Sequence, residues 1–399
     1  MKFPALENKI YLDTARSGLM YNELLSWRKE HEIDFLKRGS QFRSNHEMLL
    51  EKTRTEINNF LGSNNLTTFL VQNFSIGLSL LLNSIKSEKS VLIVKDDYSS
   101  IINQVLCSGL KYNFVDNNYD VEAQILKGIN KYNPDVFIFS IVQHIDGTLI
   151  DLDFIKQIKK DFPQILIIAD GTQFCGTQFF NFQSSKIDVL ISSGYKWMLG
   201  GYGNGFISFN HRCQKSHFKI DHQQFVNLFE PGHHDTLNFG SLLFSLIKIS
   251  NFGLDEIEKK INSLSIYTLE KLKRKKLLTS KIIKRSTHSN IFNIKDDNKL
   301  YQQLLSKNVI CSQRGDGIRI SINFYNSFSF IFSFCLLIKF RQCNHGSWMI
   351  LSIKKIFTFE VTYQFTCIFL IFISKKNAQI NYSANIGHQL TNQLFLTSF

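Results

Sequence analysis

One aspartate and one lysine follow two apolar runs that the sequence predicts to be neighbouring strands. Asp170 comes directly after residues 165–169, and Lys196 comes shortly after residues 188–192. Ligands of open α/β sheets bind at the carboxyl ends of the strands, so both side chains are expected at one edge. A buried lysine is easily neutralised, as Schiff-base chemistry requires, and a nearby aspartate can keep a pyridinium nitrogen protonated. A plain Asp–Lys salt bridge is the alternative interpretation of the pair alone.

A second candidate site lies where the first predicted strand ends and a helix begins. The free N–H groups of residues 71–77, together with the Ser75 hydroxyl, form a natural anion site. An ordinary helix N-cap is the alternative. The glycine cluster at 200–205 follows Lys196 and does not open a helix after the first strand, so it is not a dinucleotide fingerprint. It is interpreted as a tight turn beside the lysine.

The elements that must position these residues alternate along the first two hundred positions. Runs such as 165–169 are apolar throughout, which is typical of strands that are covered on both faces of a largely parallel sheet. Strands are expected at 67–71, 91–94, 135–141, 165–169 and 188–192, and helices at 21–37, 46–61, 75–86, 98–109, 121–131 and 151–161. This βαβα order predicts a doubly wound α/β domain.

Four regions are expected along the chain. Residues 1–20 form an N-terminal arm, and residues 21–252 form the large α/β domain. A helical stretch over 241–283, with a break near Gly253, leads into a β-α-β-β pattern at 289–324. This pattern predicts a small α+β domain over 253–327, and residues 328–399 form a tail of different character.

Composition excludes several classes of protein. The chain has 399 residues, 44% of them hydrophobic and 20% charged, which excludes a disordered chain, a coiled coil or a small disulfide scaffold. The net charge is +13, but the basic residues are mostly spread out, and the run at 271–276 is expected on a solvated helix face. No nucleic-acid partner is therefore predicted. Seven cysteines without a CxxC pair, and no signal peptide, indicate a cytoplasmic protein with reduced thiols and no metal site.

Taken together, these segments resemble the core of the class V aminotransferases. This group of fold type I pyridoxal-phosphate enzymes also contains cysteine desulfurases, kynureninase and isopenicillin-N epimerase. The resemblance is carried by Asp170-Gly-Thr-Gln173, by Ser193-Gly-Tyr-Lys196-Trp and by the glycine-rich turn, in this order and spacing. It extends from Tyr11-Leu12-Asp13 to residues 319–326, which is most of the chain.

The resemblance implies pyridoxal 5′-phosphate as the cofactor, with Lys196 forming the internal aldimine. Asp170 would pair with the pyridine nitrogen, and Gln173 and His144 would contact the side of the ring that carries the phenolic oxygen. Tyr98 would stack on the ring, with ordinary core packing as the alternative. The phosphate would be bound by Phe74, Ser75, Ser193 and Tyr195.

The resemblance also implies a homodimer with shared active sites. Thr236 and Asn238 match a segment that reaches the phosphate from the neighbouring subunit. Arg319 matches the arginine that binds the substrate carboxylate, because its planar guanidinium grips a carboxylate at two points. Arg314 is a second candidate for this role, and a surface salt bridge is the alternative for Arg319.

Three departures from the family pattern bear on the reaction. Desulfurases carry a catalytic cysteine on a loop between the two arginine regions, whereas only residues 315–318 separate Arg314 from Arg319 here. This disfavours a desulfurase, and Cys311 is expected on a strand. Tyr195 replaces the histidine that commonly precedes the lysine, and Arg16 stands in an N-terminal motif where small residues are usual.

The tail replaces the acidic closing helix of the family with a phenylalanine-rich segment. We hypothesise that residues 328–399 are an out-of-frame or read-through translation, which a well-formed acidic helix in another frame of the coding DNA would support. Residues 356–373 are the one candidate membrane segment, and they contain Glu360, Thr358 and Gln364. A spanning helix needs about 20 predominantly apolar residues, so a membrane anchor is not favoured.

The sequence as a whole predicts a homodimeric enzyme that transaminates an amino-acid-like substrate. Lys196, released from the cofactor, would move the α-proton. Epimerisation or lyase chemistry uses the same groups and is the alternative. A catalytically impaired relative with a damaged C-terminal domain is a third possibility.

Overall fold

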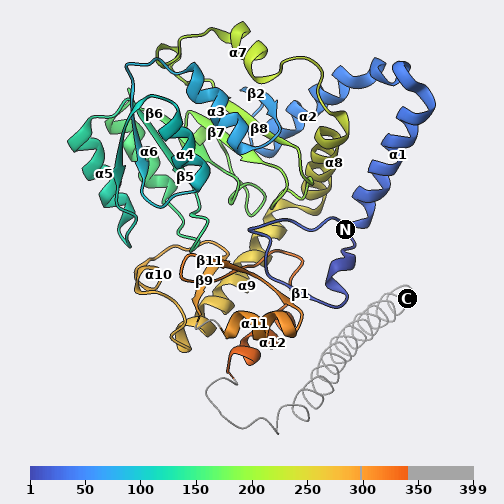
Figure 1. Cartoon of the computed structure of the whole chain (residues 1–399), viewed down its shortest axis with the longest axis vertical. Coiled ribbons are helices and arrows are strands. Elements are labelled where there is room, and N and C mark those ends of the chain that lie inside the picture. Colours follow the sequence, from blue (N-terminus) through green and yellow to red (C-terminus); the bar gives the residue numbers. More distant parts are fainter. Residues whose placement is uncertain (297–298, 340–399) are drawn as a thin grey trace, which may run out of the picture. The chain divides into compact units, whose positions relative to one another are not determined.

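A seven-stranded sheet forms the centre of the computed structural model, which describes residues 1–296 and 299–339 (Figure 1). The strand order is β2-β8-β7-β6-β5-β3-β4. β8 is antiparallel to both of its neighbours, and all other neighbouring strands are parallel. The strands are β2 (Leu66–Val71), β3 (Ser90–Val94), β4 (Lys111–Val115), β5 (Val136–Ser140), β6 (Leu166–Asp170), β7 (Val189–Ser193) and β8 (Gly205–Asn210).

The two faces of this sheet belong to separate hydrophobic cores, because successive strand residues point to opposite sides. In β3, Leu92 and Val94 join one core, while Val91 and Ile93 join the other. The first core includes residues of α1 (Asn22–Arg38), α2 (His46–Phe60), α5 (Val121–Tyr132), α6 (Leu152–Asp161) and α8 (Thr236–Phe252), and the second includes residues of α3 (Phe74–Ser84), α4 (Ser99–Cys107) and α7 (His222–Phe229). Helices on both faces explain the uniformly apolar strands and confirm the predicted doubly wound, mostly parallel fold.

Two strands and one helix of this domain were not predicted. β4 is an edge strand whose residues Lys111 and Tyr112 are exposed, so it lacks a continuous apolar run. β8 begins at Gly205, directly after the glycine-rich turn, and its antiparallel pairing does not follow the βαβ order. α7 is a short amphipathic helix with a capping box at Asp221 and Gln224.

The second group of elements is the expected small α+β domain. Its antiparallel sheet has the order β11-β12-β9. Its elements are α9 (Leu254–Arg274), α10 (Ser280–Lys284), β9 (Ile291–Lys295), α11 (Leu300–Ser306), β10 (Val309–Ile310), β11 (Ser312–Arg314), β12 (Gly317–Ser321) and α12 (Phe328–Lys339). The predicted strand at 309–312 is split at Cys311, because β10 pairs instead with β1 (Ile10–Tyr11) of the N-terminal arm.

Helix α12 begins where the sequence predicted the start of a tail outside the fold. Ile331, Phe334, Cys335 and Ile338 are buried in the small-domain core. Their spacing forms one stripe on a helix, a pattern that the many neighbouring phenylalanines obscured. The tail prediction therefore does not describe residues 328–339. The remainder of that prediction, including the candidate membrane segment 356–373, lies outside the described residues.

No helix in the described ranges has by itself both the length and the apolar composition of a membrane span. α8 and α9 satisfy such a test only when they are taken together across their 78° bend. Much of α8 is buried in the first core, with Leu242, Leu246 and Ile249 fully covered. Burial in a core accounts for the apolar character of this helix.

Candidate active site

Lys196 lies in the turn after β7, with 7% of its surface exposed. Its Nζ lies 5.9 Å from the centre of the Tyr98 ring and 5.5 Å from the centre of the Tyr195 ring. Within the described part of the chain, Nζ forms no ion pair within 4.0 Å. Burial lowers the pKa of Lys196, and the charge of Asp170 opposes this only in part. The lysine is therefore a buried amine that loses its proton easily, as a Schiff base requires.

Asp170 is the last residue of β6, the strand next to β7. It is 5% exposed, and its Oδ1 accepts a hydrogen bond of 2.8 Å from the Thr172 N–H. Burial raises the pKa of this carboxyl, and the hydrogen bonds from Thr172 oppose the rise. The structure thus brings the predicted aspartate and lysine to one edge of the sheet without the salt bridge that was the alternative.

The rings of His144 and Phe74 both lie beside Tyr98. The ring centres of Tyr98 and His144 are 5.5 Å apart in an edge-on arrangement, and those of Tyr98 and Phe74 are 6.0 Å apart. The Nδ1 atom of His144 is buried without a hydrogen-bond partner. Burial, followed by the charges of Arg319 and Lys196, lowers the pKa of His144 to about 4. This histidine is a neutral ring with one nitrogen free for a ligand.

The N-terminus of α3 lies where the sequence predicted an anion site, and phosphate binding there stays a prediction. Asn73 is the N-cap and accepts the Ile76 N–H at 3.0 Å, so the segment contains the ordinary helix cap of the alternative interpretation, formed by Asn73 and not by Ser75. The Phe74 N–H donates to Ser193 Oγ at 2.8 Å. In the residues that the structure describes, the Ser75 N–H has no acceptor, and its hydroxyl accepts a bond from Ser100 at 2.7 Å. A free N–H at a helix N-terminus suits a phosphate.

Gln173 is engaged in a way that the sequence did not predict. Its Nε2 donates to the Ala15 carbonyl at 2.9 Å, and its Oε1 accepts the indole N–H of Trp197 at 2.9 Å. The amide therefore ties the N-terminal arm to the turn that carries the lysine. The contact of Gln173 with the phenolic oxygen of the cofactor stays a prediction.

Arg319 lies on β12 and is 3% exposed, so it is not part of a surface salt bridge. Its Nη1 donates to the His144 carbonyl at 2.7 Å, and its Nη2 lies 3.8 Å from Asp13 Oδ1. Burial lowers the pKa of Arg319 to about 10. Both Arg319 Nε and Asp13 Oδ1 are buried without a hydrogen-bond partner. Sequence reasoning missed Asp13 as a site residue, and its position in an otherwise uncharged stretch at 11–15 was the available signal.

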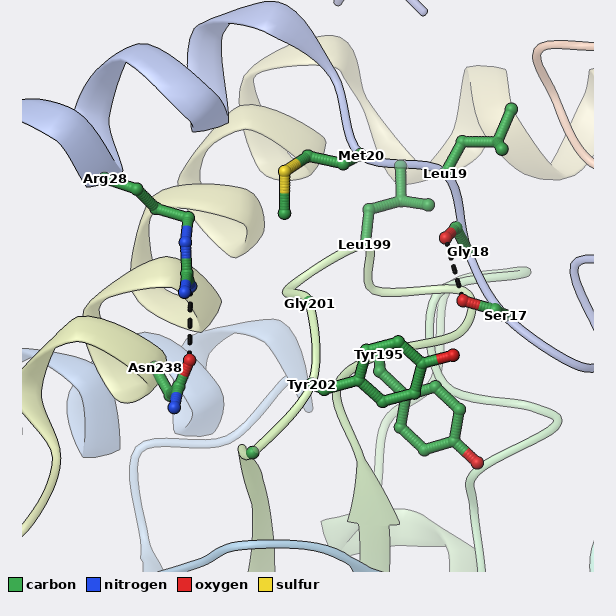
Figure 2. Close-up of a pocket in the computed structure, with 11 residues that line it drawn as sticks. Ser17, Gly18, Leu19, Met20, Arg28, Tyr195, Leu199, Gly201, Tyr202 and Asn238 are labelled. Atoms are coloured by element: carbon green, nitrogen blue, oxygen red, sulfur yellow. Dashed lines mark hydrogen bonds between the residues drawn. The ribbon is translucent and has the colours of Figure 1, made fainter. Parts of the chain in front are cut away.

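Thr236 and Asn238 lie at the start of α8, which Asp235 caps. Thr236 Oγ1 is 3.1 Å from the Nε2 of His31. Asn238 accepts a bond of 3.2 Å from Arg28, as Figure 2 shows. It lines a pocket of about 350 Å³ that the arm residues 17–20 share with Tyr195 and Tyr202, whose rings stack at 4.8 Å. Contact of Thr236 and Asn238 with the phosphate of a second subunit stays a prediction.

These groups fit pyridoxal 5′-phosphate. Lys196 supplies an unpaired amine, and Asp170 supplies a buried carboxylate for the ring nitrogen. His144 Nδ1 and the Ser75 N–H are polar atoms that lack protein partners in the described structure and can bind a ligand. Tyr98 lies beside Lys196 and can cover a flat ring.

Comparison with known proteins identifies the family to which this chain belongs. The profile of the family Aminotransferase class-V matches residues 11–330, and the chain therefore belongs to the class V aminotransferases. Its cofactor is pyridoxal 5′-phosphate, as the sequence predicted. The fold type I architecture is likewise confirmed.

The individual relatives are distant. A probable cysteine desulfurase of Ureaplasma parvum serovar 3 is 23% identical over 221 residues, which cover 51% of this chain and 54% of that protein. The match therefore spans about half the length of the relative.

Two solved structures have a similar fold, and because each is less than 25% identical to this chain, they show the fold alone. The cysteine desulfurase of Thermococcus onnurineus NA1 has a TM-score of 0.72 with 16% identity, covering 85% of this chain and 96% of its own. The cystine C–S lyase C-DES, in complex with its product cysteine persulfide, has a TM-score of 0.74 with 16% identity, covering 85% of this chain and 98% of its own.

Proposed function

We propose that this enzyme is a lyase that breaks the carbon–sulfur bond of a sulfur-containing amino acid by β-elimination. The relatives are described as cysteine desulfurases and a cystine C–S lyase, which favours chemistry at sulfur over transamination. The observation that carries the choice of a lyase is the short connection between Arg314 and Arg319. β11 and β12 are joined by Gly315 and Asp316 alone, since Arg314 pairs with Gly317.

This hairpin has no room for a loop that carries a sulfur-accepting cysteine. Cys311, the nearest thiol in sequence, is 3% exposed, and burial raises its pKa to about 12. Cys175 lies near Asp170, and burial likewise raises its pKa to about 12. A thiol with so high a pKa is not a nucleophile at neutral pH. A reaction in which sulfur leaves as part of a small-molecule product does not need a cysteine thiol to accept it.

The side chains of this site have the properties that elimination needs. When it is bound, pyridoxal phosphate supplies an electron sink that stabilises negative charge at the substrate Cα. The Lys196 amine removes the α-proton, because its lowered pKa lets it act as a base near neutral pH. The Asp170 carboxylate holds the proton of the ring nitrogen, and the Arg319 guanidinium binds the α-carboxylate.

The elimination is balanced without an oxidant or reductant. The α-proton leaves to Lys196, the Cβ–S bond breaks, and the electron pair departs with sulfur as a thiolate or persulfide. Addition of one water gives pyruvate and ammonium as the remaining products. Transamination, the prediction from sequence, needs the same lysine, aspartate and arginine and differs in requiring a keto-acid acceptor.

The experiment is a substrate panel on the protein loaded with pyridoxal phosphate, with Lys196→Ala as the control. We expect pyruvate and a sulfur product from cystine or an S-substituted cysteine, without a keto acid, and a loss of at least about a thousandfold in the variant. Amino transfer that depends on a keto acid would replace this proposal with transamination. Loss of stereochemistry without pyruvate would indicate an epimerase. Cofactor bound at Lys196 with no turnover would indicate an impaired relative.

A homodimer and a cytoplasmic location are parts of the same proposal. The support for a dimer is that Thr236 and Asn238 lie in the first turn of α8, where Asn238 lines the pocket in Figure 2. The support for a reducing compartment is that the five cysteines in the described ranges are all free thiols.

A further inference from the structure

Two arginines lie on one face of the small-domain sheet, at the end of the active site. Arg319 is paired with Ser312 across β11 and β12, and Arg314 is two residues further along β11. Because side chains alternate along a strand, Arg314 and Arg319 share a face. Gly317 lies opposite Arg314, and the space beside its Cα is taken by Asn293. This face is turned toward the site, since Arg319 Nη1 donates to the His144 carbonyl at 2.7 Å.

Arg16 approaches the same region from the N-terminal arm. The Ala15 N–H donates to Ser321 Oγ at 2.9 Å, and the Gly18 N–H donates to the Tyr195 carbonyl at 2.9 Å. These bonds hold the backbone on both sides of Arg16 between β12 and the turn that carries Lys196. Arg16 is exposed, and among the residues that the structure describes its guanidinium has no hydrogen-bond acceptor.

In the described ranges, Asp13 is the one carboxylate that forms an ion pair with any of these three arginines. Burial raises the pKa of Asp13, and the charges of Arg319, Arg16 and Arg314 all oppose that rise. Burial lowers the pKa of Arg319, and the positive charges of Arg314 and Arg16 lower it further. Asp316, in the hairpin turn, is exposed and makes no ion pair within the described ranges. Three guanidinium groups against one carboxylate leave two positive charges, and the α-carboxylate of an amino acid compensates one of them.

We propose that the substrate carries a second anionic group and that Arg16 and Arg314 bind it. The inference rests on the proposed function, in which Arg319 binds the α-carboxylate. The substrate class is then an amino acid whose sulfur substituent ends in a carboxylate or a sulfur oxyanion. Arginine suits such a group because its planar fork matches an oxyanion and stays charged at every working pH.

The first test compares two substrates of the same shape that differ by one charge. S-carboxymethyl-L-cysteine carries the second anion, and S-carbamoylmethyl-L-cysteine carries an amide in its place. We expect the acid to be preferred by at least about tenfold in kcat/KM. Arg16→Gln and Arg314→Gln should each lower this preference by about tenfold, mainly through KM. Arg274→Gln is the matched control, because Arg274 is 74% exposed on α9, and it should leave the preference as it is.

The second test measures binding without turnover. α-Methyl-L-glutamate and α-methyl-L-glutamine have no α-proton, so their affinities for the holoenzyme can be compared by calorimetry. We expect tighter binding of the acid, and loss of the difference in the Arg16→Gln and Arg314→Gln variants. Equal affinity for both ligands, or a preference that survives both variants, would overturn the inference. A preference for the acid without pyruvate from any substrate would overturn the proposed lyase and leave the inference standing.

Discussion

At the scale of single residues, burial determines what each group of the site can do. Lys196 and Asp170 could be predicted from sequence because each follows an apolar run that emerges at the same sheet edge. The partners of Gln173 could not be predicted. Its bonds to Ala15 and Trp197 depend on how the arm crosses the lysine turn, and such tertiary contacts leave no local pattern.

The neutral state of His144 can be tested through the pH dependence of stability. Its pKa is about 4 in the folded protein and about 6.5 in an unfolded chain. Between these values the unfolded chain binds more protons, so the free energy of unfolding falls as the pH falls, by up to about 1.4 kcal/mol per pH unit. The stabilisation is complete above about pH 6.5 and is lost as the pH approaches 4.

The measurement is urea unfolding of the wild type and of His144→Gln at several pH values. The variant lacks this titration, so its stability relative to the wild type should improve steadily from pH 7 to pH 4.5. A difference between the two proteins that stays constant over this range would show that His144 is protonated equally in both states.

At the scale of elements, the connections between strands decide which chemistry is available. The two-residue turn between β11 and β12 could be recognised from sequence, because Arg314 and Arg319 lie too close together for a loop. Strand β4 (Lys111–Val115) could not be recognised from sequence, because an exposed edge strand has no apolar run. α12 was missed for the opposite reason. Its phenylalanines suggested a tail, whereas the buried stripe becomes evident only beside α9.

The contribution of α12 to the fold predicts unequal effects of two similar substitutions. Phe334 is fully buried, so Phe334→Ala should lower the free energy of unfolding by about 3–5 kcal/mol. Phe328 is 51% exposed, and Phe328→Ala should cost less than about 1 kcal/mol. Denaturant unfolding of both variants measures the difference. Equally small effects would mean that residues 328–339 add nothing to the stability of the small domain.

At the scale of the whole molecule, the proposed dimer determines whether one chain suffices for activity. Thr236 is bonded to His31 within its own chain and lies at the start of α8. In the proposed assembly, its hydroxyl and Lys196 of the other copy serve the same cofactor. Each site would then need residues from two chains.

Mixed dimers of two variants test this arrangement. Lys196→Ala removes the base, and Thr236→Ala should weaken cofactor binding by about tenfold. A hybrid of the two, isolated with two different tags, should contain one intact site and recover about half of the wild-type activity at limiting cofactor. If each site lies within a single chain, the hybrid will be no more active than a mixture of the separate variants.

The N-terminal arm has a consequence for how the enzyme is made. Ile10 pairs with Val309, and Asp13 forms a bridge to Ser321, so these arm residues are synthesised long before their partners in β10 and β12. At typical rates of translation this interval is on the order of tens of seconds. Arg16 therefore reaches its position only after β12 has left the ribosome. A nascent chain can complete the large sheet much earlier, but the acid-binding end of its catalytic centre is assembled last.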